Sequence, residues 1–318
     1  MLSRVAENVY WMCRYIERAE DIARVVSVNA NLQLDLPRGI DPGWKPLIDT
    51  LGANTLFEER HKDYRERSVI QFLLGDRDSP SSVSSCLRMA RENCRTVRDI
   101  LPPEAWHYLN EVQLYVDENL ESGLTKKGRH EFLGRIVRSC QMSIGLLGSV
   151  MTRDVAYQFV RLGRNLERAD MTTRFLDMRL AVADADDMPE MSSGHALQWG
   201  IVLGALSAYH MYRRKMGAQV QRQHVLWFLF NDDESPRSFM HCLNAVEESL
   251  GMLTNNHPCL LAVRGVVNEL EQTKVETLEP GSLEALIDRL QRGLQDIHRT
   301  IARMYFLPSP AESQEADH

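Results

Sequence analysis

Apolar residues recur every three to four positions along most of the chain, the spacing that gathers them on one face of an α-helix. Two long helices are predicted, one from residue 3 to about 34, where Pro37 and Gly39 follow, and one at 153–182. Shorter helices are predicted at 43–53, 66–74, 80–101, 103–122, 128–150, 195–213, 219–230, 236–254, 258–273 and 282–306. No alternating stretch is long enough to indicate a strand, so the sequence predicts an all-α fold.

Two segments lack the helical spacing. Residues 184–194 are acidic and contain Pro, Gly and Ser, which predicts a loop, and residues 308–318 (PSPAESQEADH) are predicted to form a disordered tail. The longest apolar stretch, from Trp199 to Tyr212, is shorter than a membrane span requires. The first residues carry acidic side chains and lack the apolar core of a secretory signal. We therefore expect a cytoplasmic protein that does not bind membranes.

Two pairs of segments repeat along the chain at nearly the same offset. CRYIERAEDIAR (13–24) aligns with GRNLERADMTTR (163–174) at an offset of 150, and FLLGDRDSPSS (72–82) aligns with FLFNDDESPRS (228–238) at an offset of 156. Two matches in the same order predict a tandem duplication. We expect residues 1–151 and 152–307 to form two units of about six helices each. An approximate two-fold axis should relate the units within one compact bundle, with the two long helices packed against each other.

Each copy of the second block contains a Ser-Pro pair. Ser79 and Ser235 are predicted to cap a helix, with the proline at the first helical position, where its missing N–H costs nothing. The acidic residues just before each pair, such as Asp76 and Asp232, suit the positive end of a helix. A cation site is the alternative interpretation of these acids.

The composition is that of an ordinary globular protein. The 318 residues are 44% hydrophobic and 25% charged, and a chain of this length buries a large core without needing a disulfide or a metal. The net charge of −7 argues against nucleic acid as a partner. The cysteines form no CxxC pair, which predicts buried reduced thiols rather than a zinc site or a disulfide framework. They are Cys13, Cys86, Cys94, Cys140, Cys242 and Cys259.

The first repeated block places charged residues at helical spacing. With about 100° per residue, Glu17, Glu20 and Arg24 fall on one stripe at the edge of the apolar face, and Arg14 and Arg18 lie further round. One interpretation is a structural network in which Glu17/Arg14 and Glu20/Arg24 pair and tie neighbouring helices together. The other is a binding site formed by both copies, with arginines for carboxylate or phosphate and acids for an amine. The candidate binding residues are Arg14, Glu17, Arg18, Glu20, Arg24, Arg164, Glu167, Arg168, Asp170 and Arg174.

A further charged segment covers residues 90–111, and the second copy lacks its arginines. A basic ridge at helical spacing usually faces solvent. Its presence in one copy alone makes it a second candidate for a one-sided function. This second cluster comprises Arg91, Glu92, Arg95, Arg98, Trp106 and Asn110.

Three segments of the chain resemble signature segments of a known family. MLSRVAENVYWMCRYIERAEDIAR, ARENCRTVRDILPPEAW and GRNLERADMTTRFLDMR are similar to those of the bacterial Alpha-E family, whose ER motif corresponds to Glu17-Arg18 and Glu167-Arg168. The resemblance runs from residue 1 to about 306. It implies an ATP-grasp-type protein of circularly permuted form as partner, with transglutaminase-like proteins and a proteasome-like hydrolase in the same gene cluster. The family is suspected of serving a peptide-type amide ligase, and its own activity is unassigned.

Motifs of common enzymes are missing from the sequence. The ten histidines form no HExxH motif, and neither a GxxxxGK[ST] loop nor a GxGxxG fingerprint occurs, so we expect no metal and no cofactor. No nucleophile recurs beside the charged stripe, because Cys13 aligns with Gly163, and the catalytic residues stay unknown. The leading hypothesis is a non-catalytic accessory or substrate-presenting partner of an ATP-grasp amide ligase. The alternatives are an enzyme or small-molecule-binding protein that uses the Glu/Arg clusters, or a self-associating structural protein.

Overall fold

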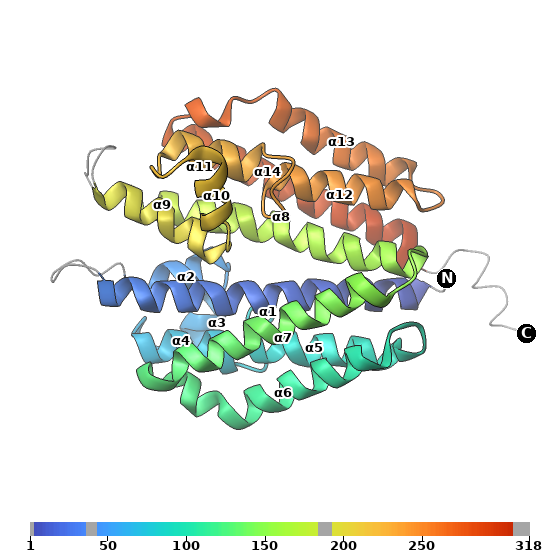
Figure 1. Ribbon diagram of the computed structural model, residues 1–318, viewed down its shortest axis with the longest axis horizontal. Helices are drawn as coiled ribbons and strands as arrows, with labels where there is room; N and C mark the ends of the chain where they lie inside the picture. The colour runs from blue at the N-terminus through green and yellow to red at the C-terminus, as the bar shows by residue number, and fades with distance from the viewer. Residues whose placement is uncertain (1–2, 36–42, 184–192, 308–318) are drawn as a thin grey trace, which may run out of the picture.

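The computed structural model describes residues 3–35, 43–183 and 193–307, and the regular elements in these ranges are helical. Two long helices, α1 (Ser3–Asp35) and α8 (Val155–Ala183), lie side by side at the centre (Figure 1). The other α-helices are α2 (Lys45–Thr50), α3 (Asn54–Arg60), α4 (Glu66–Gly75), α5 (Val83–Thr96), α6 (Pro103–Leu124), α7 (Lys126–Val150), α9 (Ser193–Ala205), α10 (Tyr209–Met216), α11 (Arg222–Phe230), α12 (Phe239–Gly251), α13 (His257–Glu271) and α14 (Pro280–Ile301). Short helical turns follow at Arg98–Ile100, Val275–Thr277 and Ala302–Phe306. The all-α prediction is confirmed.

The predicted packing of the two long helices is also confirmed. Helices α1 and α8 run in the same direction, with α3 to α6 gathered on one side of the pair and α10 to α14 on the other (Figure 1). Helix α1 packs against α5, α7 and α9, while α8 packs against α12, α14 and α2. Each long helix therefore contacts neighbours from both ends of the chain.

A glycine brings the two central helices together. A Cβ atom on Gly163 of α8 would lie 2.2 Å from the backbone oxygen of Tyr10 in α1. Real Cβ atoms do not approach an oxygen so closely, and a backbone atom cannot move aside as a flexible side chain does. Gly163 therefore allows the close crossing that sets the register of α1 against α8.

The buried surface of α1 is wider than the predicted apolar face. Ile16, Ala19 and Ile22 of that face are fully buried, as expected. Glu17 and Asp21, however, are also fully buried, because neighbouring helices cover α1 on several sides. The charged stripe expected at the edge of the buried face thus lies inside the molecule.

Several helix boundaries differ from the prediction. The helix predicted at 195–213 is divided into α9 and α10, because Ser207 adopts a φ of 55°, which a right-handed helix cannot contain. Helix α3 was not predicted. The predicted loop at 184–194 lies outside the described residues up to residue 192, and the predicted tail at 308–318 lies outside them entirely.

The predicted caps at Ser79 and Ser235 were wrong by three residues. Helices α5 and α12 begin later. The hydroxyl of Ser82 accepts a hydrogen bond from the backbone N–H of Ser85, and the hydroxyl of Ser238 accepts one from the backbone N–H of His241. The Ser-Pro pairs form the preceding turn instead, where the hydroxyl of Ser79 accepts from a backbone N–H two residues later. The capping chemistry was recognised correctly, but the serine that performs it is the last one of each block.

All six cysteines are buried and free, which confirms the prediction of reduced thiols. Within the described residues, no helix combines the length and the apolar character that crossing a bilayer demands.

Candidate functional site

The two ER pairs meet at the centre of the α1–α8 interface and exchange partners. Glu167 of α8 accepts hydrogen bonds from the Nε atoms of Arg14 and Arg18 of α1, at 2.6 Å and 2.5 Å. In return, Glu17 of α1 accepts from Nε of Arg168 of α8 at 2.6 Å. Each buried glutamate is therefore neutralised by arginines of the other long helix.

The expected pairing within one helix holds for only part of the stripe. Arg24 donates to Glu20 at 2.6 Å, one helical turn away, as predicted. Asp170 and Arg174 of α8 form the same pair at 2.8 Å. The expected pair of Glu17 with Arg14 was wrong: Arg14 binds Glu167, because the face that carries both residues of α1 packs directly on α8.

Two residues missed at the sequence level complete the network. Arg237, in the turn before α12, donates to Glu17 and Asp21 at 2.9 Å and to Glu20 at 3.3 Å. Asp21 is fully buried. In the aligned blocks Ser81 stands opposite Arg237 and Met171 opposite Asp21, so the charges occur in one copy only. These two residues could have been found in the sequence, because each is a charged residue aligned with an uncharged one in the other copy of its block.

The environment separates the pKa values of the buried acids. Burial alone would raise the pKa of Glu17, but the nearby guanidiniums of Arg168, Arg237 and Arg164 outweigh it and lower the pKa to about 2. The pKa of Glu167 falls to about 2 for the same reason. Burial raises the pKa of Asp21 to about 7, because the attraction of Arg237 offsets only part of the burial cost and Glu17 and Glu20 repel the charge. The two glutamates are thus fixed as anions, and Asp21 titrates near neutrality.

A cleft of about 460 Å³ opens next to this network. Its charged walls combine Glu20 and Arg24 of α1 with Arg164 and Arg168 of α8 and with Arg237. Its other lining residues are Gln141, Ile144, Gly145, Gly148, Ser149, Ser207, Ala208, Met211, Ser235 and Pro236. The cleft brings together five charged side chains, and four of them were candidates from the sequence.

Arg164 is the least engaged of the arginines in the cleft. Its Nε lies 3.4 Å from a carboxylate oxygen of Glu17, in a geometry that makes no hydrogen bond. Its side chain is 36% exposed, whereas that of Arg168 is 8% exposed and firmly paired. Burial and repulsion by Arg168 and Arg237 lower the pKa of Arg164, which indicates an excess of positive charge at this point.

The opposite side of the interface is closed by aromatic groups. Arg14 also donates to the hydroxyl of Tyr10 at 3.2 Å, and that hydroxyl lies 2.9 Å from Nδ1 of His298 in α14. Burial, together with the charge of Arg14, lowers the pKa of His298 to about 4. The imidazole is therefore neutral at physiological pH and stacks against Tyr10. This side is packed, and the cleft side is open.

The second candidate cluster lies on the surface of α5 and α6. Arg91 donates to Asn110 and to Glu92, both at 2.8 Å, and its guanidinium sits 4.8 Å from the centre of the Trp106 ring. Arg95 donates to Glu92 as well. Arg98, the sixth member, begins the turn Arg98–Ile100 and is exposed. Five of the six predicted residues are thus in mutual contact, away from the lining of the cleft.

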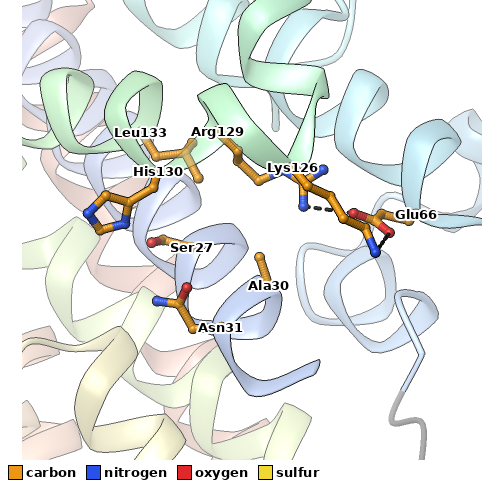
Figure 2. A pocket seen from close by; sticks show the side chains of 8 residues that line it. All are labelled: Ser27, Ala30, Asn31, Glu66, Lys126, Arg129, His130 and Leu133. Atoms are coloured by element: carbon orange, nitrogen blue, oxygen red, sulfur yellow. Dashed lines mark hydrogen bonds and ion pairs between the residues drawn. The ribbon is translucent and has the colours of Figure 1, made fainter. Parts of the chain in front are cut away.

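A smaller hollow of about 120 Å³ lies between α1 and the start of α7 (Figure 2). Arg129 of α7 is buried there and donates to Glu66 of α4 at 2.8 Å, and Lys126 lies 3.6 Å from the same carboxylate. Arg129 also donates to backbone oxygens of the α6–α7 turn, so its donors serve to hold α4, α6 and α7 together. None of the residues expected to bind a ligand lines this hollow.

Comparison with known proteins identifies relatives along nearly the whole chain. Residues 1–306 match the family Alpha-E, described as a predicted alpha-helical domain with a conserved ER motif. Uncharacterised proteins of Mycobacterium bovis and Mycobacterium tuberculosis are similar to this chain, with 23% identity over 328 residues. The similarity covers 94% of this chain and 35% of each relative, so the chain spans about a third of the length of these curated relatives. No solved structure matches.

Proposed function

We propose that this chain, which belongs to the Alpha-E family, is a non-catalytic accessory subunit that holds a substrate for a partner enzyme. The observation that carries the proposal is the arginine-lined cleft beside a closed network of ion pairs. A pre-formed cleft of about 460 Å³ has the size of a small-molecule site. The network behind it fixes the positions of the charged walls.

The protonation states of nearby groups support a binding role over covalent catalysis. The pKa of Glu17 and Glu167 is about 2, so neither carboxyl holds a proton that it could donate at neutral pH. Burial raises the pKa of Cys86 and Cys242 to about 12, so neither thiol supplies the thiolate that nucleophilic catalysis requires. These groups are suited to holding structure and charge in place.

An ATP-grasp amide ligase is the partner that we propose, on the basis of the family resemblance. Such an enzyme joins a carboxylate to an amine through an acyl-phosphate. About two thirds of each mycobacterial relative lies outside the part that matches this chain, which leaves room for a fused partner. A transglutaminase-like protein of the same gene cluster is a second proposed partner.

Co-purification of this chain with an ATP-grasp protein of the kind that the family resemblance implies tests the proposal. We expect a stable complex and a faster ligase turnover with the chain than without it. Gly145→Leu should leave the complex intact and lower turnover, because Gly145 lines the cleft and a Cβ there meets no atom within 4 Å. Gly265→Leu in α13 is the matched control, since its Cβ also enters open space and Gly265 does not line the cleft.

Two outcomes contradict this proposal in different ways. Failure to co-purify, together with unchanged ligase turnover, removes the accessory role. Turnover of a substrate by this chain alone would instead favour the second candidate function, an enzyme that uses the duplicated Glu/Arg clusters. One observation favours that alternative: Asp21 is a buried carboxyl whose pKa of about 7 suits a general base.

We also propose that the bundle arose by duplication of a unit of about six helices. The reciprocal contacts support this, since Arg14 and Arg18 bind Glu167 while Arg164 and Arg168 approach Glu17. Helix α2 packs on α8, and α9 packs on α1, so each long helix has a neighbour contributed by the other half. Superposing residues 1–151 on 152–307 should align most helices in order about a two-fold axis. Two halves with different helix arrangements would show that the duplication is wrong.

A further inference from the structure

The cleft contains more positive charge than its own acids neutralise. Arg24, Arg164, Arg168 and Arg237 line it, so four guanidinium groups face one space. Among the described residues, three carboxyls are in contact with them, those of Glu17, Glu20 and Asp21. Burial and the neighbouring glutamates raise the pKa of Asp21 to about 7, so its carboxyl is partly protonated at neutral pH and neutralises less than one charge.

We infer that this cleft binds the oxyanion group of a small ligand, a carboxylate or a phosphate, between Arg164 and Arg168. This inference rests on the proposed function for the fate of the ligand and extends it by naming the ligand's chemistry. Arg164 forms no hydrogen bond in the described part of the chain, although its Nε is buried. Arg168 donates to Glu17 through Nε and to the backbone oxygen of Pro236 through Nη1 at 3.5 Å, so its guanidinium is held in place and Nη2 is the further donor that it offers in the cleft lining. Planar guanidinium groups match the oxygens of carboxylate and phosphate.

An ammonium group does not fit the same place. Glu20 is the acid among the lining residues, and one of its oxygens already accepts hydrogen bonds from Arg24, Gln141 and Arg237. Glu17, behind it, is fully buried and held by arginines. A cation in the cleft would face four guanidinium groups and one lining carboxylate that is already bound by arginines, so the recognised group is an anion.

The rest of the cleft has room for more than the anion. Ile144, Ala208, Met211 and Pro236 supply apolar surface, and the glycines of α7 leave space that larger side chains would fill. An apolar wall with a few converging polar groups is the usual make-up of a small-molecule site. The expected ligand therefore carries an oxyanion at one end and an uncharged portion that lies against α7 and α10.

Titration calorimetry on the full chain tests the inference, with inorganic phosphate and glutarate as probes at constant ionic strength. We expect saturable binding of at least one probe, and the tighter one identifies the source of the oxyanion. Arg164→Gln should weaken it about tenfold or more, the loss expected for one hydrogen bond to a charged group, and Arg24→Gln, which removes one positive charge from the lining, should weaken it by a smaller factor. Arg174→Gln is the matched control, because Arg174 pairs with Asp170 in the geometry of Arg24 and Glu20 but does not line the cleft.

Each outcome decides the inference. Absence of saturable binding of either probe below about 10 mM overturns it. Equal weakening by Arg174→Gln and Arg24→Gln also overturns it, since the effect would then come from net charge and not from the cleft. If an arginine variant does not fold, Gly145→Leu replaces it: this change keeps every charge and fills the cleft, and it should abolish binding while Gly265→Leu retains it. Binding that survives Gly145→Leu rejects the site. These measurements need no partner protein, so loss of the ATP-grasp complex would leave their result standing.

Discussion

Replacing Glu17 by glutamine is expected to lower the free energy of unfolding by about 3–5 kcal/mol, the loss seen when one member of a buried ion pair is removed. Glu17 is fully buried, and its carboxylate faces Arg164, Arg168 and Arg237. Glutamine keeps the shape of the side chain and removes its charge. Three arginines then lose a counter-charge that bulk water cannot replace.

Glu167→Gln should have an effect in the same range, because Glu167 is also fully buried and neutralises Arg14 and Arg18. Glu92→Gln provides the matched control. Glu92 likewise pairs with two arginines, but its side chain is 40% exposed, so water screens the pairs and the loss should be about 0–1 kcal/mol.

Urea unfolding of the three variants at neutral pH, and of the two buried ones in acid, checks this expectation. Both buried glutamates have a pKa near 2 in the folded protein and an ordinary value of 4.5. Their contribution is therefore complete above pH 4.5 and is lost as the pH falls toward 2. The difference in the free energy of unfolding between wild type and each buried variant should narrow over that range.

Small, equal losses in all three variants would mean that the central network is solvated. Unchanged stability with a loss of ligase stimulation would assign the glutamates to ligand binding.

Asp21→Asn is expected to act in the opposite direction and to raise the free energy of unfolding above pH 7. Asp21 is fully buried, shares Arg237 with Glu17 and Glu20, and has a folded pKa of about 7 against an ordinary value of 3.8. The folded state therefore holds this proton more tightly than the unfolded state, and stability falls as the pH rises from about 4 to 7. Asparagine removes the charge that causes this fall.

Thermal melts of wild type and Asp21→Asn between pH 4 and 8 measure the effect. The difference between the two melting temperatures should be smallest near pH 4, where the carboxyl is protonated in the folded state and only about half ionised in the unfolded state, and it should grow as the pH rises to 7. A variant that is less stable than wild type at pH 8 would show that the pair of Asp21 with Arg237 outweighs the burial of its charge. The opposite signs expected for Asp21→Asn and Glu17→Gln distinguish two acids that lie one helical turn apart and share Arg237.

Local spacing was sufficient to predict the helices and part of the site. The apolar face of α1 follows from a period of 3.6 residues, and the pair of Glu20 with Arg24 follows from the distance along one helix. The repeated ER pairs correctly marked the helices that pack together. These features depend on neighbours within the same segment, and a single sequence contains that information.

The remaining features depend on contacts between distant segments. Helical spacing assigned Arg14 to Glu17, whereas the packing of α1 on α8 brings it to Glu167. Arg237 lies in a turn, where no period identifies it, and it reaches Glu17 only because α12 packs on α8. The cleft exists because Gly145 and its neighbours leave space beside arginines from other helices. A glycine cannot be recognised from the sequence as part of a cleft, because the cleft is defined only once the surrounding helices are in place.

Arg14 and Arg18 meet Glu167 across 153 and 149 residues of chain, and Glu17 meets Arg237 across 220. During synthesis, therefore, α1 leaves the ribosome long before its counter-charges exist. Desolvating these groups alone costs several kcal/mol for each ion, so we expect the charged side of α1 to stay exposed to water until α8 and the turn before α12 have been made, while its other side packs on α5 and α7. We therefore expect the central ion pairs to form late in synthesis. A chain that ends before this turn would leave the charged face of α1 unpaired and exposed, and we expect proteases to degrade such a chain faster than the full-length protein.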